Sequence, residues 1–184
     1  MIENIVLSKD NILNKYSNLE YIYKDAIEVI YGKQKSNLFT IYNFDNVGND
    51  IIDSYCRSKN DKDNNTKCAL RKKTGVYLFI DKDEIVYIGV GGTGKTDDIL
   101  KRIDAEVRVY DKTNNSNATL SKNISDVDSL LLNKDVTYKD SLDKIKTLKL
   151  LVISIGNMSK QKNKLISKSL EQVLIALFNS RYNK

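Results

Sequence analysis

The sequence predicts an α+β fold: a small three-stranded sheet, mixed or antiparallel, flanked by helices in the order β-β-α-β-α. Three observations lead to this prediction. Two short β-rich runs are joined by a polar turn, a nearly continuous apolar run follows later, and amphipathic helical patterns lie between and after these runs. No β-α-β unit repeats along the chain, so a doubly wound parallel sheet is not expected.

Residues 1–73 are predicted to form an N-terminal helical extension. Residues 9–31 carry apolar side chains at helical spacing and stop at Gly32, and a short helix is also expected within residues 38–57. The polar, turn-rich segment 57–67 then marks a domain boundary. The extension is expected to pack on the core, although its tyrosines are also suited to binding nucleic acid.

The first elements of the core follow this boundary. The runs "GVYLFI" (75–80) and "IVYIG" (85–89) are separated by a short polar turn, which predicts an antiparallel hairpin. After a Gly-rich loop, residues 96–110 have a helical pattern, with Thr96 or Asp97 available as the N-cap. A strand pair followed by a helix is therefore expected.

The rest of the predicted core, which spans residues 74–184, surrounds an insertion. Residues 111–146 are rich in Asn, Ser, Asp and Lys and are only weakly periodic, so we interpret them as the insertion. The apolar run "LKLLVISIG" (148–156) suits a buried central strand, and residues 160–183 have a strong amphipathic helical pattern.

The composition excludes several kinds of active site and suggests where the protein acts and what it binds. The 184-residue chain has no histidine and two cysteines, Cys56 and Cys68, which excludes Ser-His-Asp triads, histidine-based metal nucleases and four-thiolate zinc sites. Such cysteine usage suggests reduced thiols, and no run approaches the roughly 18 apolar residues of a membrane span, so we expect a cytoplasmic protein with no membrane partner. The net charge of +6 favours a polyanionic partner, nucleic acid first, although A·T-rich codons would also enrich lysine.

One stretch matches a nucleotide-binding motif. Residues Gly89–Thr96 fit the G-x-x-x-x-G-K-[ST] pattern of phosphate-binding loops. Such a loop normally follows the first strand of a parallel sheet, and a later strand ends in an aspartate that holds magnesium. Here the preceding strand has an antiparallel partner, and the later apolar strand ends in Gly156. Nucleotide hydrolysis with Lys95 and Thr96 is therefore the less favoured alternative.

Glu171 is the most informative single residue. It falls on the apolar face of the last predicted helix, together with Leu174, Ile175 and Phe178. A carboxylate in that setting is costly unless a cation or hydrogen-bond donors accompany it. Both a buried structural ion pair and a magnesium ligand satisfy this requirement.

Three further side chains are candidates on position alone. Arg102 borders an apolar stripe on its predicted helix, where an exposed ion pair with Asp98 or Glu106, each four residues away, is an equally good explanation. Tyr77 and Tyr87 lie on the two hairpin strands, and core packing is the simpler explanation for a strand tyrosine. Two hairpin tyrosines together with a buried acid elsewhere in the chain favour a functional role for the pair.

These residues together resemble a known family. The "GVY" of residues 75–77, the "YIG" of residues 87–89, a helix arginine, a later helix glutamate and the terminal "RYN" resemble the GIY-YIG endonuclease family. The resemblance covers roughly residues 74–184, interrupted by the insertion. It implies a nuclease core that hydrolyses DNA phosphodiester bonds with one divalent ion, Mg²⁺ or Mn²⁺, in each active site.

The resemblance also implies roles for individual residues. Glu171 matches the metal-binding glutamate, and Arg102 matches the arginine that neutralises the scissile phosphate. Tyr77 and Tyr87 match the tyrosines that position or deprotonate the attacking water, and Asn183 matches an asparagine that follows the glutamate helix. A tyrosine with an ordinary pKa near 10 is a poor base at neutral pH, so nearby cations are expected to lower the pKa of these tyrosines.

The chain also departs from the family. Many members have a histidine one turn after the arginine, where this sequence has Glu106, so the general base is left unassigned.

For DNA binding we expect Lys95 and Arg108 to contact phosphates, and the amides of Gly91 and Gly92 to form an anion-binding nest. A solvated lysine and a plain flexible turn are the alternatives for the loop.

The layout resembles the compact restriction endonucleases of the family. The extension and the insertion would then recognise double-stranded DNA, and a palindromic site would make the enzyme a homodimer. A catalytically inactive DNA-binding module of the same fold is the main rival, since the histidine is missing and lysine is abundant. A nuclease toxin or defence effector with little sequence preference is also consistent with the sequence.

Overall fold

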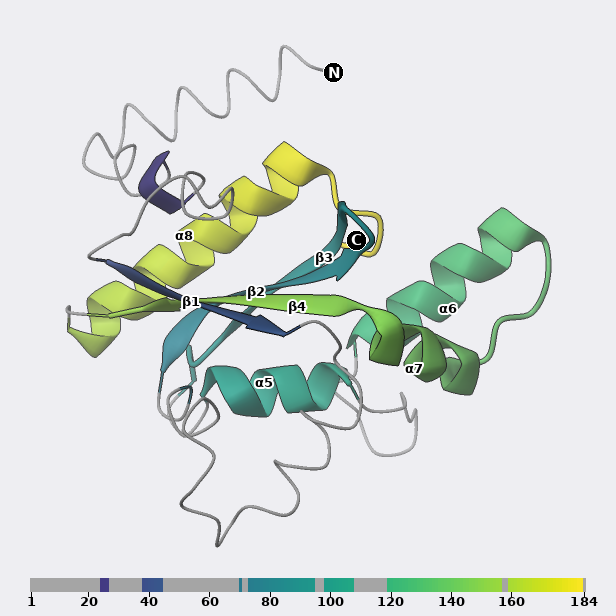
Figure 1. Ribbon diagram of the computed structural model, residues 1–184, viewed down its shortest axis with the longest axis horizontal. Helices are drawn as coiled ribbons and strands as arrows, with labels where there is room; N and C mark the ends of the chain where they lie inside the picture. The colour runs from purple at the N-terminus through teal and green to yellow at the C-terminus, as the bar shows by residue number, and fades with distance from the viewer. Residues whose placement is uncertain are drawn as a thin grey trace, which may run out of the picture.

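The computed structural model describes residues 24–26, 38–44, 70, 73–94, 98–107, 119–156 and 159–183. Within these ranges the protein has an α+β fold, as the sequence predicts. A four-stranded antiparallel sheet has the strand order β1-β4-β2-β3, with helices on both sides (Figure 1). No helix in these ranges combines the length and apolar character needed to cross a bilayer.

The predicted hairpin is confirmed. Strands β2 (Thr74–Asp81) and β3 (Glu84–Gly91) pair antiparallel, with Tyr77 opposite Gly89 and Phe79 opposite Tyr87. The predicted central strand is β4 (Lys149–Ile155), which pairs antiparallel with the other side of β2. As a result β3 is an edge strand, and the hairpin tyrosines lie near that edge.

A further strand corrects the three-stranded prediction. β1 (Phe39–Phe44) pairs antiparallel with β4, in a region where only a short helix was expected. Its sequence, "FTIYNF", is rich in the aromatic and β-branched residues that favour strands. Within the predicted extension, 1–73, the structure describes only residues 24–26, 38–44, 70 and 73. Residues 24–26 are helical, in agreement with the helix predicted over 9–31, and the other residues of that helix lie outside the described ranges.

The two core helices agree with the predictions within a few residues. α5 (Ile99–Glu106) is capped by Asp98, whose side chain accepts from the Lys101 N–H, and not by the expected Thr96 or Asp97. α8 (Lys160–Phe178) ends at Asn179, which adopts a left-handed conformation with φ 45°. That cap stops the helix before residue 183, the predicted end.

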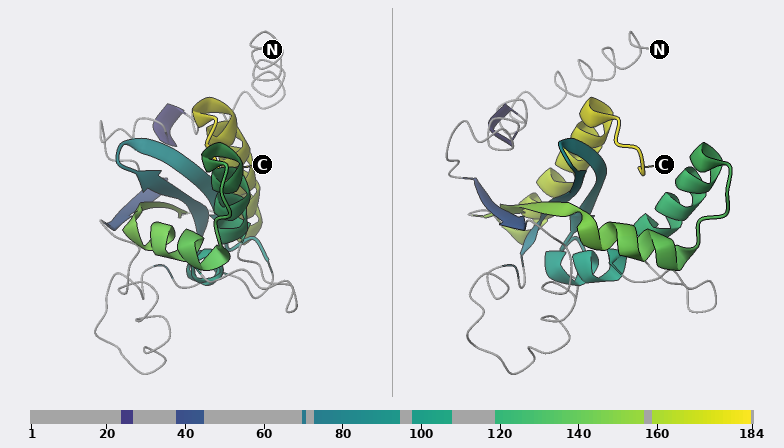
Figure 2. Two further views of the ribbon diagram at one scale, coloured as in Figure 1. Left: turned by 90° about the vertical axis from the view of Figure 1, so that its right-hand side faces the viewer. Right: turned by 45° about the vertical axis from the view of Figure 1, so that its right-hand side comes forward.

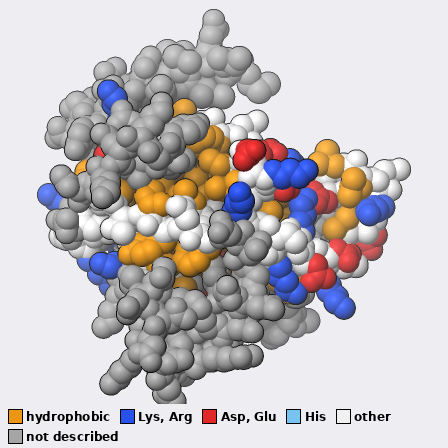
Figure 3. Space-filling model, in the orientation of Figure 1, with side chains coloured by type: hydrophobic (Ala, Val, Ile, Leu, Met, Phe, Trp, Pro, Cys, Tyr) orange, Lys and Arg blue, Asp and Glu red, His pale blue; other side chains and the backbone are white. Residues whose placement is uncertain are grey.

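The insertion is more regular than its weak periodicity indicated. It contains α6 (Thr119–Leu132) and α7 (Tyr138–Thr147), which pack against each other beside the sheet (Figure 2). Thr137 and Asp140 form a capping box at the start of α7, which explains how so polar a segment begins a helix. Acidic and basic side chains are interspersed over α6 and α7 (Figure 3).

Two apolar clusters lie on opposite faces of the sheet. The odd-numbered hairpin residues Tyr77, Phe79 and Tyr87 pack on the face covered by α5, α6 and α7. The alternate residues, such as Leu78 and Ile88, pack under α8. This alternation is the period of two expected of strands covered on both faces, and it places both hairpin tyrosines beside α5.

Candidate active site

A fully buried carboxylate, that of Glu106 at the end of α5, is the centre of the candidate site. Its Oε1 accepts hydrogen bonds from the hydroxyls of Tyr77 and Tyr87, each at 3.1 Å. The same oxygen lies 2.6 Å from an Arg102 guanidinium nitrogen. Three side chains from three elements therefore converge on one oxygen atom; we call these four residues the Glu106 cluster.

Local sequence explains how the cluster forms. Glu106 is seven residues after Ile99 and three after Ile103, so it shares their buried helix face. On β3, Gly89 leaves room for the Tyr77 phenol, because a Cβ at that position would lie 2.3 Å from the Tyr77 hydroxyl oxygen. The glycine of the "YIG" run is thus required by close packing against a tyrosine of the neighbouring strand.

The insertion completes the cluster. The backbone N–H of Leu120, in the first turn of α6, donates to the Oε2 of Glu106 at 2.8 Å. The neighbouring Thr119 hydroxyl accepts from the Arg102 guanidinium at 3.3 Å. Segment 111–146 is consequently part of the site and not only a surface addition, although residues 111–118 lie outside the description.

Burial and charge act on the pKa values in opposite directions. Burial raises the pKa of Glu106, while Arg102, the Leu120 N–H and the two phenols lower it, and the net shift is upward. Burial and the Glu106 charge raise the pKa values of Tyr77 and Tyr87 well above their usual range. Arg102 lowers the pKa values of both tyrosines, as expected of a cation, but desolvation and Glu106 outweigh its effect.

Glu171 reaches the same region from the other face of the sheet. It is half-buried on α8, the helix that packs on the other face of β2 and β3. Burial raises its pKa, while a hydrogen bond from Gln172 and the charge of Arg102 lower it. The charge of Glu171 in turn raises the pKa of Tyr87. The grouping of Glu171 with Arg102 and Tyr87 in one site stays a prediction.

Asn183 lies at the outer edge of β3, where it holds the strand. Its amide oxygen accepts from the Ile88 N–H at 2.7 Å, and its amide nitrogen donates to the Ile88 carbonyl at 2.7 Å. The Ser180 hydroxyl donates to the same amide oxygen at 2.6 Å. These contacts give Asn183 a direct role in positioning β3 beside Tyr87, and none of them requires a substrate.

The expected DNA-binding residues are only partly described. Lys95 and Arg108 lie outside the described residues, and Gly91 and Gly92 are buried. A Cβ on Gly91 would meet the Ile99 backbone at 2.6 Å, and Gly92 has φ +75° with its carbonyl accepting from Thr74. Packing and backbone conformation therefore explain both glycines. The described strands pair only antiparallel, unlike the parallel sheet of nucleotide hydrolases.

The donor set suits a lightly held divalent ion. Among the described residues, no group of three or more His, Cys, Asp or Glu side chains is placed to hold a metal. Mg²⁺ usually keeps several waters and takes only one or two carboxylates from a protein. The half-buried Glu171 fits that requirement as a single protein ligand. Glu106 does not, because both of its oxygens already accept hydrogen bonds from the protein.

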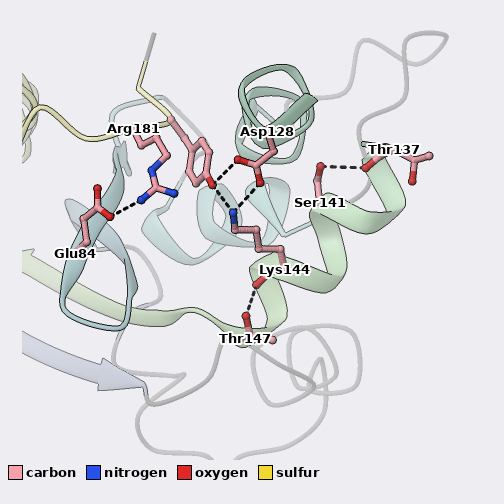
Figure 4. A network of polar contacts seen from close by, with 8 residues as sticks. Glu84, Asp128, Thr137, Ser141, Lys144, Thr147 and Arg181 are labelled. Carbon is pink, nitrogen blue, oxygen red and sulfur yellow. Dashed lines mark hydrogen bonds and ion pairs between the residues drawn. The ribbon is translucent and has the colours of Figure 1, made fainter. Parts of the chain in front are cut away.

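A second polar network joins the insertion to the chain end (Figure 4). Lys144 lies 2.7 Å from the carboxylate of Asp128 and 2.5 Å from the hydroxyl of Tyr182, which itself donates to Asp128 at 3.0 Å. We call these three residues the Asp128 cluster. Nearby, Arg181 pairs with Glu84 at the hairpin turn. The cluster links α6, α7 and the segment after α8.

Sequence reasoning missed the central place of Glu106. It considered that residue only as an ion-pair partner for Arg102 and as the position of the missing histidine. The signal was present, because a glutamate in register with Ile99 and Ile103 is a carboxylate on an apolar helix face, the same pattern that identified Glu171. The contribution of Leu120 has no such signal, since it uses a backbone N–H.

Comparisons with known proteins add no relative: no protein-family model, curated protein or solved structure matches the chain. The similarity to GIY-YIG endonucleases therefore depends on the motifs "GVY" and "YIG" and on the residues that accompany them. It stays a prediction.

Proposed function

We propose that this protein is a metal-dependent endonuclease that hydrolyses phosphodiester bonds in DNA. One observation carries the proposal: the Arg102 guanidinium and the hydroxyls of Tyr77 and Tyr87 meet at one buried oxygen of Glu106. A cation can stabilise the charge that develops on a phosphate, and an oriented phenol backed by a carboxylate can position the attacking water.

Each group has a distinct task in this proposal. Arg102, with 26% of its side chain exposed, stabilises the negative charge that develops on the phosphate oxygens. Tyr87 orients the attacking water, because its hydroxyl proton is directed at Glu106 and its oxygen is left as an acceptor. Asn183 keeps β3 and its tyrosine in place.

Glu171 would hold the divalent ion, Mg²⁺ or Mn²⁺. When bound, such an ion supplies Lewis-acid stabilisation of charge on the reacting phosphate. Glu171 is suited to it because its carboxylate is only partly buried, so that an ion and its waters can reach it. The single carboxylate leaves the other coordination positions to water and substrate.

We further propose a sequence-specific, restriction-type enzyme that acts in the cytoplasm on double-stranded DNA, as a homodimer if the site is palindromic. The α6–α7 surface seen in Figure 3 mixes both charge signs, so we assign phosphate contacts to other surfaces. Digestion of linear plasmid DNA tests the specificity: discrete bands support it, and a continuous smear points instead to a nuclease with little sequence preference.

The decisive experiment compares wild type with Glu171→Ala on supercoiled DNA in Mg²⁺. Several kcal/mol of lost charge stabilisation corresponds to a loss of at least about 100-fold in cleavage rate. Glu84→Ala is the matched control, because it removes a surface glutamate paired with Arg181 at the hairpin turn and should leave the rate unchanged. A wild type that cuts no DNA in Mg²⁺ or Mn²⁺, or a fully active Glu171→Ala, contradicts the proposal.

A second candidate, a DNA-binding module that does not cleave, is favoured by one contact. The ion pair between Arg102 and Glu106 at 2.6 Å compensates the charge that the phosphate would otherwise meet. If this candidate is correct, wild type retards DNA in a gel without cutting it, and Glu171→Ala binds equally well. Cleavage by wild type excludes it.

A further inference from the structure

The hydrogen-bond directions in the Glu106 cluster define where protons can move. A phenol has a single proton, and both Tyr77 and Tyr87 donate theirs to the same oxygen of Glu106. Toward any other partner, each phenol oxygen therefore acts as an acceptor. Both hydroxyl protons thus point toward Glu106, which is the acceptor for any proton that either phenol gives up.

The two tyrosines are not equivalent. Tyr77 is completely buried, whereas Tyr87 keeps 5% of its surface exposed. The charge of Glu171, the proposed metal ligand, acts on Tyr87 together with that of Glu106. Tyr87 is therefore the phenol with some access to solvent, while Tyr77 supports Glu106 from inside the core.

We propose that Glu106 accepts the proton of the attacking water through Tyr87, and that its neutralisation releases Arg102 toward the phosphate. This inference depends on the proposed nuclease function and names its missing base. Glu106 acts through another residue, so it is a positioning and proton-accepting residue behind Tyr87.

The bond changes balance as follows. The water oxygen forms a bond to phosphorus while its proton passes to the Tyr87 oxygen, and the original phenol proton passes to the Oε1 of Glu106. The bond between phosphorus and the leaving oxygen breaks, and that oxygen takes a proton from solvent. The net result is hydrolysis, with one proton stored on Glu106 until solvent removes it.

This relay avoids the difficulty of a tyrosinate base. Burial and Glu106 raise the pKa of Tyr87 far above neutral pH, so a free phenolate is not populated. The groups that face Glu106 are Tyr77 from β2, Tyr87 from β3, Arg102 from α5 and the Leu120 N–H from α6. As Glu106 becomes neutral, its ion pair with Arg102 weakens at the moment when charge develops on the phosphate.

The pH dependence of DNA cleavage tests the relay. Wild type and Glu106→Gln are compared from pH 5 to 9 on supercoiled DNA, with Mg²⁺ kept saturating so that Glu171 stays ionised. Wild type should lose activity at acidic pH, where Glu106 becomes protonated. Because burial raises the pKa of Glu106, this acid limb of the pH profile should lie above the ordinary glutamate range. Glu106→Gln should be slower by about 100-fold or more and should lack the acid limb.

Double substitution separates a relay from a purely structural contact. Tyr87→Phe and Glu106→Gln should each cost a similar factor, and the double variant should be no slower than either, because the two residues act as one unit. Tyr77→Phe removes the other phenol on the same oxygen and should cost less than about 10-fold. An acid limb retained in Glu106→Gln, or losses that multiply in the double variant, overturns the inference.

A measurement without DNA keeps this test distinct from that of the nuclease function. Tyrosine ionisation is followed by absorbance during alkaline titration of wild type, Glu106→Gln and Tyr87→Phe. Loss of the Glu106 charge should let the buried phenols ionise at lower pH, and an unchanged titration contradicts the coupling. A wild type that cuts no DNA at any pH overturns the nuclease function and the relay with it, while this titration still measures the coupling of Glu106 to Tyr87.

Discussion

The Glu106 cluster and the Asp128 cluster are built from the same chemical groups but are organised differently. Each combines a carboxylate and a cation with tyrosine: one hydroxyl in the Asp128 cluster and two in the Glu106 cluster. In the Asp128 cluster, Lys144, Tyr182 and the carboxylate each contact the other two. In the Glu106 cluster, three side chains converge on one oxygen. The Asp128 cluster is thus a closed triangle of contacts, whereas in the Glu106 cluster both phenol hydrogen bonds and the Arg102 ion pair lead to Glu106.

Their surroundings differ in the same way. The side chain of Glu106 is 0% exposed, whereas those of Asp128 and Lys144 are 11% and 30% exposed. In the Glu106 cluster, the charge of a second carboxylate, Glu171, also raises the pKa of Tyr87. The partly exposed Asp128 cluster is suited to holding α6, α7 and the segment after α8 together. The buried Glu106 cluster, with its hydrogen bonds converging on one carboxylate, is suited to accepting a proton.

The largest expected difference between the clusters is in stability. Glu106→Ala leaves the Arg102 charge, two buried phenols and the Leu120 N–H without their acceptor, so the free energy of unfolding should fall by about 3–5 kcal/mol. Urea denaturation followed by circular dichroism measures the change. Glu106→Gln, which keeps one acceptor oxygen, is the matched control and should lose less. A loss below about 1 kcal/mol for Glu106→Ala would mean that the cluster is not the buried network described here.

A smaller effect is expected for the Asp128 cluster. In Asp128→Ala, Lys144 turns to solvent, so only the partly exposed ion pair and one phenol hydrogen bond are lost, at about 1–2 kcal/mol. The same urea measurement applies, and Lys144→Met should cost a similar amount because it breaks the same triangle. DNA cleavage by Asp128→Ala, assayed below its unfolding midpoint, should match wild type. A cleavage loss as large as that of Glu106→Gln would remove the distinction between the clusters.

The smallest expected effect is a loss of stability at alkaline pH, which tests how deeply Tyr77 of the Glu106 cluster is buried. Because folding raises the pKa of Tyr77 above its unfolded value near 10, its contribution to stability is complete below pH 10 and is lost as pH rises further. At pH 10.5 the loss amounts to about 1 kcal/mol. Melting temperatures between pH 9 and 11 should fall less steeply for Tyr77→Phe than for wild type. Parallel curves for the two proteins would show that Tyr77 does not titrate differently on folding.

Several features were predictable because their causes are local. The alternation of apolar residues in β2 and β3 and the apolar run of β4 identify strands, and Asp98 and Ser159 begin helices within a few residues of the expected positions. Strand β1 was missed because a short β-rich run gains stability only by pairing with β4. The α6 and α7 helices were missed because polar sequences form helices through caps and tertiary packing.

The candidate site shows the same division. Glu171 was predicted from its position on an apolar helix face, and the same rule would have identified Glu106. What could not be read from the chain is the partner of each buried group, such as the amide of Asn183, which holds a strand 95 residues away.

By itself, the sequence determined the α+β class, the hairpin with its two tyrosines and the helices that carry Arg102 and Glu171, because spacing along one element decides which face a residue occupies. The tertiary structure alone decided that Arg102 and both phenols meet on one oxygen of Glu106, with the Leu120 N–H on the other, and that Glu171 approaches from the opposite face. Contacts between elements depend on how helices and strands pack in three dimensions, and no spacing within a single element contains that information.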